Sequence, residues 1–218
     1  MPGGVMDDSD AGLVEAWRGG DREAGRRLFV RHYAGVARFF RNKVGEAGTD
    51  LIQRTFLACL EGRERFRHEA SFRSYLFSIA YKVLCKHFRE LRRDLQRREG
   101  PAVDFEEMSA YQLTSPLSEV AARQEQRLLL EGLRRLPVDY QVVLELHYWE
   151  GLSAAELAEV LAIPIGTAKT RLRRGRELLE ARLQELSASA VLLQSTLVNL
   201  DRWAAQLRVQ VLGDDEEA

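Results

Sequence analysis

The sequence has little cysteine and no long hydrophobic run, and each shortage excludes a class of protein. Its two cysteines, Cys59 and Cys85, form no CxxC pair, which argues against a disulfide framework and fits a reducing compartment. No apolar run approaches the ~18 residues that a membrane span requires. Residues 1–12 lack the basic start and apolar core of a signal peptide. We therefore expect a cytoplasmic protein without membrane insertion.

Motifs of catalysis are also missing. The chain contains no P-loop, no GxSxG sequence and no nucleotide-binding glycine run. The best set of metal ligands would be Cys59, His68, Cys85 and His87, but no pair of them has the C-x2-C or H-x3-H spacing of a zinc site. In a helix, Cys85 and His87 would lie about 200° apart. We therefore predict that the protein is not an enzyme and has no catalytic residue, metal, cofactor or small-molecule substrate.

Proline is confined to a few places, which indicate how the chain is divided. Residues 13–91 contain no proline, and their apolar residues recur at intervals of three and four, as in helices. Residues 96–118 hold Gly100, Pro101 and Pro116 with several acids and no periodicity, which is typical of a linker. Beyond it, Pro137 and Pro164 divide a second periodic stretch. We expect a helical domain at 11–95, a flexible acidic linker at 96–118, a second helical domain at 119–183 and a C-terminal helical extension at 184–218, an all-α fold.

Capping residues give the expected helix boundaries. Asp21, Thr49 and Ser71 each precede an apolar-periodic run in the first domain, as N-cap residues do. In the second domain we expect helices at about 119–135, 138–149, 153–161 and 165–182. From Leu183 to Val211, apolar residues alternate spacings of three and four, a helix-packing seam ending in the acidic residues 214–217. We expect this seam to pack on the first domain, a second copy or a regulatory partner, or to be only a structural cap.

Charge is segregated along the chain although the formal net charge is only −1. Residues 82–98 carry seven Lys or Arg against two acids, and residues 165–182 carry six against two. Residues 99–119 carry five acids and no base. Helices often collect bases at their C-terminal ends, but two such segments favour two basic helices that can meet phosphates.

The strongest motif is a helix-turn-helix at residues 153–182. Ser153 and Glu156 form a capping box, and a tight turn at residues 162–164 separates the two helices. At ~100° per residue, one face of the second helix is apolar and the other basic. Such a helix can pack inward while it reaches bases and phosphates in the major groove. The apolar face holds Ile165, Ala168, Leu172, Gly175 and Leu179, and the opposite face and its flanks hold Gly166, Lys169, Thr170, Arg171, Arg173 and Arg174.

Residues 136–183 resemble the promoter −35-binding domain of extracytoplasmic-function sigma factors in the sigma-70 family. The resemblance is carried by LP at 136–137, EGLS at 150–153, ELAEVL at 156–161 and IPIGTAKTRLRRGR at 163–176. It implies −35 DNA binding by Gly166, Thr167, Lys169, Thr170, Arg171, Arg173, Arg174 and Arg176, with Arg171 and Arg176 holding phosphates or neighbouring helices. Two positions depart from the pattern. Ala162 stands where members often have glycine, so a left-handed residue there would cost about 1 kcal/mol. Arg173 stands where side chains vary and base preference is set.

Residues 49–93 resemble the −10-binding half of the same family. The segment DLIQRTF at 50–56 is similar to the one that docks on the clamp helices of the polymerase, which implies polymerase binding by Asp50, Leu51, Gln53 and Phe56. Arg54 replaces the usual acid, so one charge of that surface is inverted. For Leu51 and Phe56 a role in the core remains an equal alternative.

The helix that follows Ser71 has the features of a single-strand-binding surface. A basic ridge is expected on this helix beside several aromatic residues, because its cations are spaced four, three and four residues apart: Lys82, Lys86, Arg89 and Arg93. Single-stranded DNA is held by stacking on aromatics next to cations. The resemblance implies that the loop at 62–71 captures a flipped −10 base and that the helix holds the opened strand, with Lys82 in place of a common Asn. The −10 candidates are Phe72, Tyr75, Tyr81, Lys82, Lys86 and Arg89.

Together the two halves predict a sigma factor that binds core RNA polymerase and promoter DNA, with an anti-sigma or other regulatory protein as a further candidate partner. The alternative is a stand-alone helix-turn-helix regulator that binds operators as a dimer. The first domain discriminates between them, because such a regulator needs neither a clamp-binding helix nor a strand-binding helix.

Overall fold

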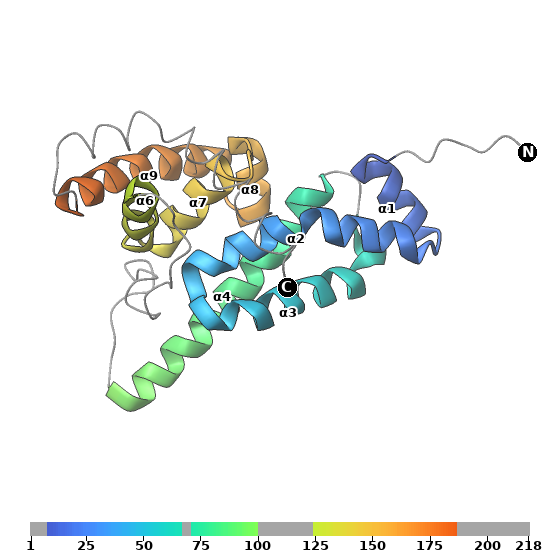
Figure 1. Cartoon of the computed structure of the whole chain (residues 1–218), viewed down its shortest axis with the longest axis horizontal. Coiled ribbons are helices and arrows are strands. Elements are labelled where there is room, and N and C mark those ends of the chain that lie inside the picture. The colour runs from blue at the N-terminus through green and yellow to red at the C-terminus, as the bar shows by residue number, and fades with distance from the viewer. Residues whose placement is uncertain (1–7, 67–70, 100–123, 187–218) are drawn as a thin grey trace, which may run out of the picture.

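The computed structural model describes residues 8–66, 71–99 and 124–186, which form eight α-helices in two groups (Figure 1). The first group contains α1 (Asp10–Arg18), α2 (Arg22–Val44), α3 (Gly48–Glu61) and α4 (Phe72–Glu99), with short 3-10 turns at Gly45–Ala47 and Arg63–Arg65. The second contains α6 (Gln124–Arg134), α7 (Val138–Tyr148), α8 (Ala154–Leu161) and α9 (Ile165–Leu186). The expected all-α fold is confirmed.

Two of the three capping residues expected in the first group are confirmed. Asp21 Oδ1 accepts hydrogen bonds from the backbone N–H groups of Glu23 and Ala24 at the start of α2. Ser71 Oγ accepts one from the N–H of Ser74 at the start of α4. Thr49 was wrongly expected to cap α3, because the 3-10 turn before it leads directly into a helix that begins at Gly48.

Aromatic rings hold the first group together. Trp17 of α1 meets Phe29 of α2 edge-on, with ring centroids 5.5 Å apart, and Phe72 of α4 at 6.4 Å. Phe72 also lies 6.1 Å from Phe66, in the segment between α3 and α4. Each edge-to-face pair of this kind stabilises the fold by about 0.5–1.5 kcal/mol, in addition to the stabilisation from the apolar surface that the rings bury. These contacts join α1, α2 and α4 around one core.

The second group contains the helix-turn-helix. The predicted capping box is confirmed: Ser153 Oγ accepts from the N–H of Glu156 at 3.2 Å, and the Glu156 carboxylate accepts from the N–H of Ser153 at 2.8 Å. Ala162 ends α8 in the left-handed conformation, with φ 54° and ψ 47°. Gly175 of α9 packs so closely on α7 that a Cβ there would lie 3.2 Å from Leu144 Cγ.

The two groups pack against each other. Helix α8 lies on α4, and α2 contacts both α6 and α7 (Figure 1). The buried apolar residues of both groups form one continuous core.

Helix ends differ from the expected boundaries. Helix α4 continues to Glu99, so the first residues of the segment expected as linker are helical. Helix α9 continues to Leu186, past the expected end at 182. Residues 100–123 and 187–218 lie outside the described residues, and with them the rest of the linker and most of the predicted packing seam.

Candidate nucleic-acid interface

Helix α9 presents a polar face beside an apolar one, as the sequence predicts. Ala168, Leu172, Gly175 and Leu179 are buried against α7, α8 and α6. Ile165, expected on the packed face, is instead 49% exposed at the first position of α9. The outer face is open to solvent at Gly166, Lys169, Thr170, Arg173, Arg174 and Arg176, whereas Thr167 and Arg171 are half-buried.

Most side chains of this face already have partners on the protein. Arg173 pairs with Glu177 one turn further along, at 2.7 Å and in the open, where such pairs contribute little. Thr170 Oγ donates to the Gly166 carbonyl at 2.9 Å. The Arg176 guanidinium lies 5.3 Å from the Tyr148 ring of α7, a cation–π distance. A phosphate or base can replace these weak surface contacts at low cost.

Arg171 is held differently from the other basic residues of α9. Its guanidinium pairs with the Asp139 carboxylate at the start of α7, at 2.7 Å, with both side chains about one-fifth exposed. The implied role of Arg171 in holding a neighbouring helix therefore agrees with its geometry.

The −10 candidates on α4 fall into two sets. Lys82, Lys86 and Arg89 lie exposed along one side of the helix. Lys86 is 3.9 Å from Glu90, and Arg89 Nε donates to the Cys85 carbonyl at 3.2 Å. These three cations form an exposed ridge that can follow a phosphate backbone.

The aromatic −10 candidates are mainly structural in this arrangement. Phe72 is 3% exposed and belongs to the core. Tyr75 Oη donates to the Gly62 carbonyl at 3.1 Å, and Tyr81 Oη donates to Asp139 Oδ1 at 3.3 Å. Burial raises the pKa of Tyr81, so its hydroxyl stays protonated. For Tyr75 or Tyr81 to stack on a DNA base, the side chain would have to break the hydrogen bond that its hydroxyl makes here.

The polymerase candidates lie on α3. Asp50 and Gln53 are exposed, and Asp50 pairs with Arg54 at 2.8 Å, so the inverted charge at Arg54 neutralises its neighbour. Leu51 is 1% exposed, which favours its core role. Phe56 is half-buried, and its centroid lies 4.9 Å from Phe29.

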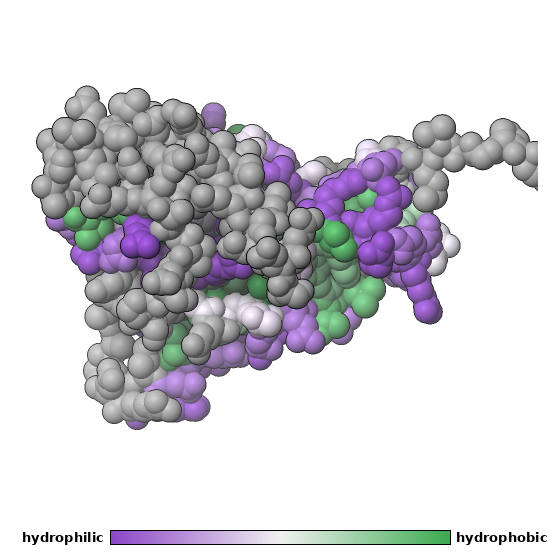
Figure 2. All heavy atoms as spheres, in the orientation of Figure 1, coloured by the Kyte–Doolittle hydropathy of each residue, from purple (hydrophilic) through white to green (hydrophobic). Residues whose placement is uncertain are grey.

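An exposed apolar patch beside these residues was not predicted from the sequence. Val30 and Tyr33 of α2 and Leu57 and Leu60 of α3 are each between 45% and 64% exposed. Figure 2 shows a hydrophobic area where α2 and α3 lie side by side. Tyr33 stacks on Phe56 at 6.2 Å, which joins the patch to the predicted surface. The i, i+3 spacing of Val30 with Tyr33 and of Leu57 with Leu60 is the signal that could have found it.

The described residues offer little for metal, membrane or thiol chemistry. Within residues 8–66, 71–99 and 124–186, no group of three or more His, Cys, Asp or Glu is placed to hold a metal ion, and His68 lies outside these ranges. None of the helices described is long and apolar enough to cross a membrane. Burial raises the pKa of Cys59 to about 12 and also raises that of Cys85, so neither is an activated thiol.

Family models match each of the two helical groups, and known proteins match most of the chain. The family model for Sigma-70 region 2 matches residues 27–94, and that for Sigma-70 region 4 matches residues 126–179. The ECF RNA polymerase sigma-E factor of Haemophilus influenzae is 27% identical over 82% of this chain and 97% of its own length. The factor of the same name from Escherichia coli is 24% identical over 82% and 96%.

Solved structures agree on the fold. The sigma factor RpoE from Bartonella quintana, solved with the anti-sigma factor NepR, has a TM-score of 0.59 at 19% identity and covers 74% of this chain and 98% of its own. CnrH, solved with the cytosolic domain of CnrY, has a TM-score of 0.56 at 25% identity and covers 82% and 99%. The two matched regions together span more than half of the sequence, in the order and on the helices expected. The chain belongs to the sigma-70 family, and within it to the extracytoplasmic-function group of RNA polymerase sigma factors.

Proposed function

We propose that this sigma factor binds core RNA polymerase, reads the −35 element with α9, and holds the opened −10 strand with α4. The observation that carries the proposal is that each matched region presents an exposed row of cations on one helix, at Lys169 to Arg176 and at Lys82 to Arg89. No catalytic group is needed. Unstacking and unpairing a base costs a few kcal/mol, which binding of the released strand can offset. We place this activity in the cytoplasm, with the polymerase.

At the −35 element, the exposed arginines supply specificity and the remaining cations supply affinity. Arg173 and Arg174 stand on the outer face of α9, where a guanidinium can bond two acceptors of guanine in the major groove. Lys169 is a point charge suited to phosphate. Arg171, tied to Asp139, positions α9 on α7.

At the −10 element, the ridge of Lys82, Lys86 and Arg89 follows the backbone of the displaced strand. Its charge attracts DNA in any sequence, and the exposed side chains lose little on binding. The base-capturing loop implied by the resemblance spans residues 62–71, of which 67–70 lie outside the described residues.

Polymerase docks on α3 and on the adjoining part of α2. Asp50 and Gln53 form the polar edge of that surface, and Phe56 joins it to the apolar patch of Val30, Tyr33, Leu57 and Leu60. Contiguous exposed apolar residues with a polar rim are typical of a protein interface. The similar chain CnrH was solved with part of CnrY, and we propose a regulatory protein as a further partner of this surface or of α9.

Transcription reconstituted with purified core polymerase tests the proposal. The full chain, core polymerase and a library of random promoters should yield transcripts that share two sequence elements, and the chain alone should bind core polymerase without DNA. A chain that binds duplex DNA as a dimer, and never binds polymerase, would instead be the stand-alone regulator.

A further inference from the structure

Ile165, the first residue of α9, is an apolar side chain that the fold leaves in solvent. It is 49% exposed, whereas Ile163, two positions earlier, packs against the core. Among the described residues, the other exposed large apolar side chains belong to the patch on α2 and α3: Val30, Tyr33, Leu57 and Leu60. Ile165 lies on another helix, so neither the core nor that patch accounts for its exposure.

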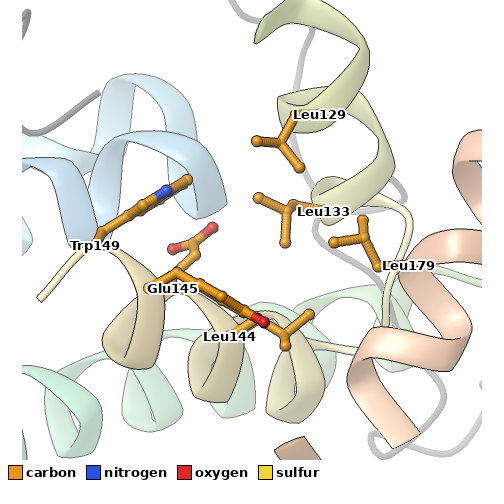
Figure 3. A pocket seen from close by; sticks show the side chains of 7 residues that line it. Leu129, Leu133, Leu144, Glu145, Trp149 and Leu179 are labelled. Atoms are coloured by element: carbon orange, nitrogen blue, oxygen red, sulfur yellow. The ribbon is translucent and has the colours of Figure 1, made fainter. Parts of the chain in front are cut away.

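The rest of α9 is held by the helices behind it. Figure 3 shows Leu179 of α9 near Leu133 of α6, in a pocket that Leu144 of α7 also lines. Closer to the start of the helix, Ala168 and Leu172 are buried as well. This packing fixes the axis and the rotation of α9, and with them the direction in which its exposed first turn faces.

The neighbours of Ile165 on the surface of α9 belong to the proposed −35-reading face. Lys169 is four residues further along, so the two side chains are adjacent on the helix surface. Arg173 continues the same row after four more residues. Gly166 adds no bulk beside Ile165, and even a Cβ there would have open space around it. The exposed methyl groups of Ile165 therefore border a cationic face that DNA can approach closely.

The first turns of a recognition helix are where side chains meet base edges in the major groove. The edges there present hydrogen-bonding groups at every base pair and one apolar group, the C5-methyl of thymine. An aliphatic side chain offers neither a donor nor an acceptor, so of these groups only the methyl matches Ile165. Contact between the two removes apolar surface of both from water.

Thr170 is the competing candidate for such a methyl group. Its side chain is exposed, and its hydroxyl donates to the Gly166 carbonyl at 2.9 Å, which leaves its own methyl for an apolar contact. Five residues separate it from Ile165, or about 140° around the helix, so one thymine methyl cannot contact both side chains. Ile165 has the larger apolar surface and lies nearer the start of the helix.

We propose that Ile165 contacts the C5-methyl group of a thymine in the −35 element and thereby selects thymine at that position. This inference rests on the proposed function, because it takes α9 as the helix that enters the major groove of the −35 element. The cations beside Ile165 attract DNA of any sequence. Ile165 adds a preference for one base, and it is a specificity-determining residue in addition to Arg173 and Arg174.

Uracil differs from thymine only by the missing C5-methyl, so it tests the contact directly. The probe is a promoter fragment with the −35 sequence that the holoenzyme recovers from the random library, in which each thymine of that element is replaced in turn by uracil. The full-length chain with core polymerase is given equal amounts of the thymine and uracil fragments, and the bound share of each is measured. The natural chain should prefer thymine about fourfold at one position, the effect of burying roughly one methyl group. Ile165→Ala should reduce that ratio to about one and leave the ratios at other positions unchanged.

Two matched variants each lose one methyl group from a nearby side chain. Ile163→Val loses it at the edge of the core, and Thr170→Ser loses it on the outer face of α9. Both should keep the preference of about fourfold, whatever their effect on overall affinity. Because the ratio compares two DNA fragments bound by the same protein, a smaller folded fraction in a variant does not change it.

Several results would overturn the contact and leave the proposed function standing. These are a preference that persists in Ile165→Ala, a natural chain that binds thymine and uracil equally at every position, and a −35 element without thymine. Loss of the preference in Thr170→Ser would assign the methyl to Thr170. Its loss in Ile163→Val would show that the turn before α9 sets it, rather than the side chain of Ile165. If the holoenzyme recovers no −35 element, or the chain does not bind polymerase, the proposed function itself is wrong and the contact falls with it.

Discussion

Trp17 of α1 packs directly on Gly25 of α2, so closely that a Cβ at Gly25 would lie 2.5 Å from two atoms of the indole. We expect Gly25→Ala to destabilise the protein by about 2 kcal/mol, because the overpacking outweighs the ~1 kcal/mol by which alanine favours a helix over glycine. Urea unfolding measures the change. Gly48→Ala is the control: its added methyl would meet Phe40 and Val44 at an ordinary 3.8 Å, so a comparable loss there would refute the packing argument.

Ala162 occupies the left-handed conformation between α8 and α9. Ala162→Gly should stabilise the second group by about 0.5–1 kcal/mol. This value is the backbone strain that glycine relieves, minus the conformational entropy that glycine adds to the unfolded chain. Ala155→Gly, on the exposed side of α8, should do the opposite by a similar amount. Thermal unfolding of the two variants should therefore shift in opposite directions, and a shared direction would contradict the assignment of strain.

Arg173 and Lys169 should differ in what they contribute to −35 binding. Arg173→Ala should change which bases are preferred, by about 1–3 kcal/mol if the contact is bidentate. Lys169→Ala should weaken all sequences evenly and reduce the salt slope by about one. Selection of bound promoters by holoenzyme at two salt concentrations checks both. An Arg173→Ala and Arg174→Ala double variant with unaltered base preference would remove the recognition role of α9.

Lys86 and Arg89 should act after the strands separate. The double alanine variant should slow open-complex formation while leaving duplex binding nearly unchanged, because the proposed function has these cations hold the strand released by melting. Permanganate footprinting follows the opening. A template with a premelted −10 region should rescue the variant, and failure to do so would mean that the ridge has another role.

Asp10 gives the attachment of α1 a pH dependence. The hydrogen bond from His32 at 2.7 Å, aided by Arg31 at 2.8 Å, lowers the pKa of Asp10 to about 2. A depressed carboxyl pKa stabilises the folded state above pH ~4, and this contribution is lost as the pH falls toward 2. Asp10→Asn should cost about 1 kcal/mol at pH 7, since the site is partly exposed, and only a small fraction of that at pH 2, where about half of the carboxyl is protonated. Unfolding at pH 7, 4 and 2 measures the difference, and a constant difference would argue against it.

The fold was largely predictable because its signals are local. The Ser153 capping box, the Asp21 cap and the periodic apolar residues each depend on neighbours within a few positions. The prediction that Thr49 caps α3 was wrong because a 3-10 turn at Gly45–Ala47, and not a capping side chain, leads into that helix. The exposed basic face of α9, which carries the candidate DNA-binding residues, was also predictable, since a basic face opposite an apolar one is a local pattern.

The contact between the halves could not be predicted in the same way. Lys43 and Glu145 are charged, and charged residues are usually expected on the surface. A weak signal exists in each helix: Lys43 continues the stripe of Val36 and Phe40, and Glu145 continues that of Val138 and Val142. Only the folded structure shows that Lys43 and Glu145, which interrupt these two apolar stripes, contact each other.

Gly35 and Glu150 carry a consequence for the evolution of the group. The Glu150 carboxylate lies against α2 at Gly35, where a Cβ would come within 2.9 Å of Oε2, and it reaches Arg38 from that place. A larger residue at the position of Gly35 would have to displace this carboxylate from its place beside Arg38. The two positions are therefore expected to change together among extracytoplasmic-function factors, and lineages that lost the pair should be those whose halves have become independent of each other.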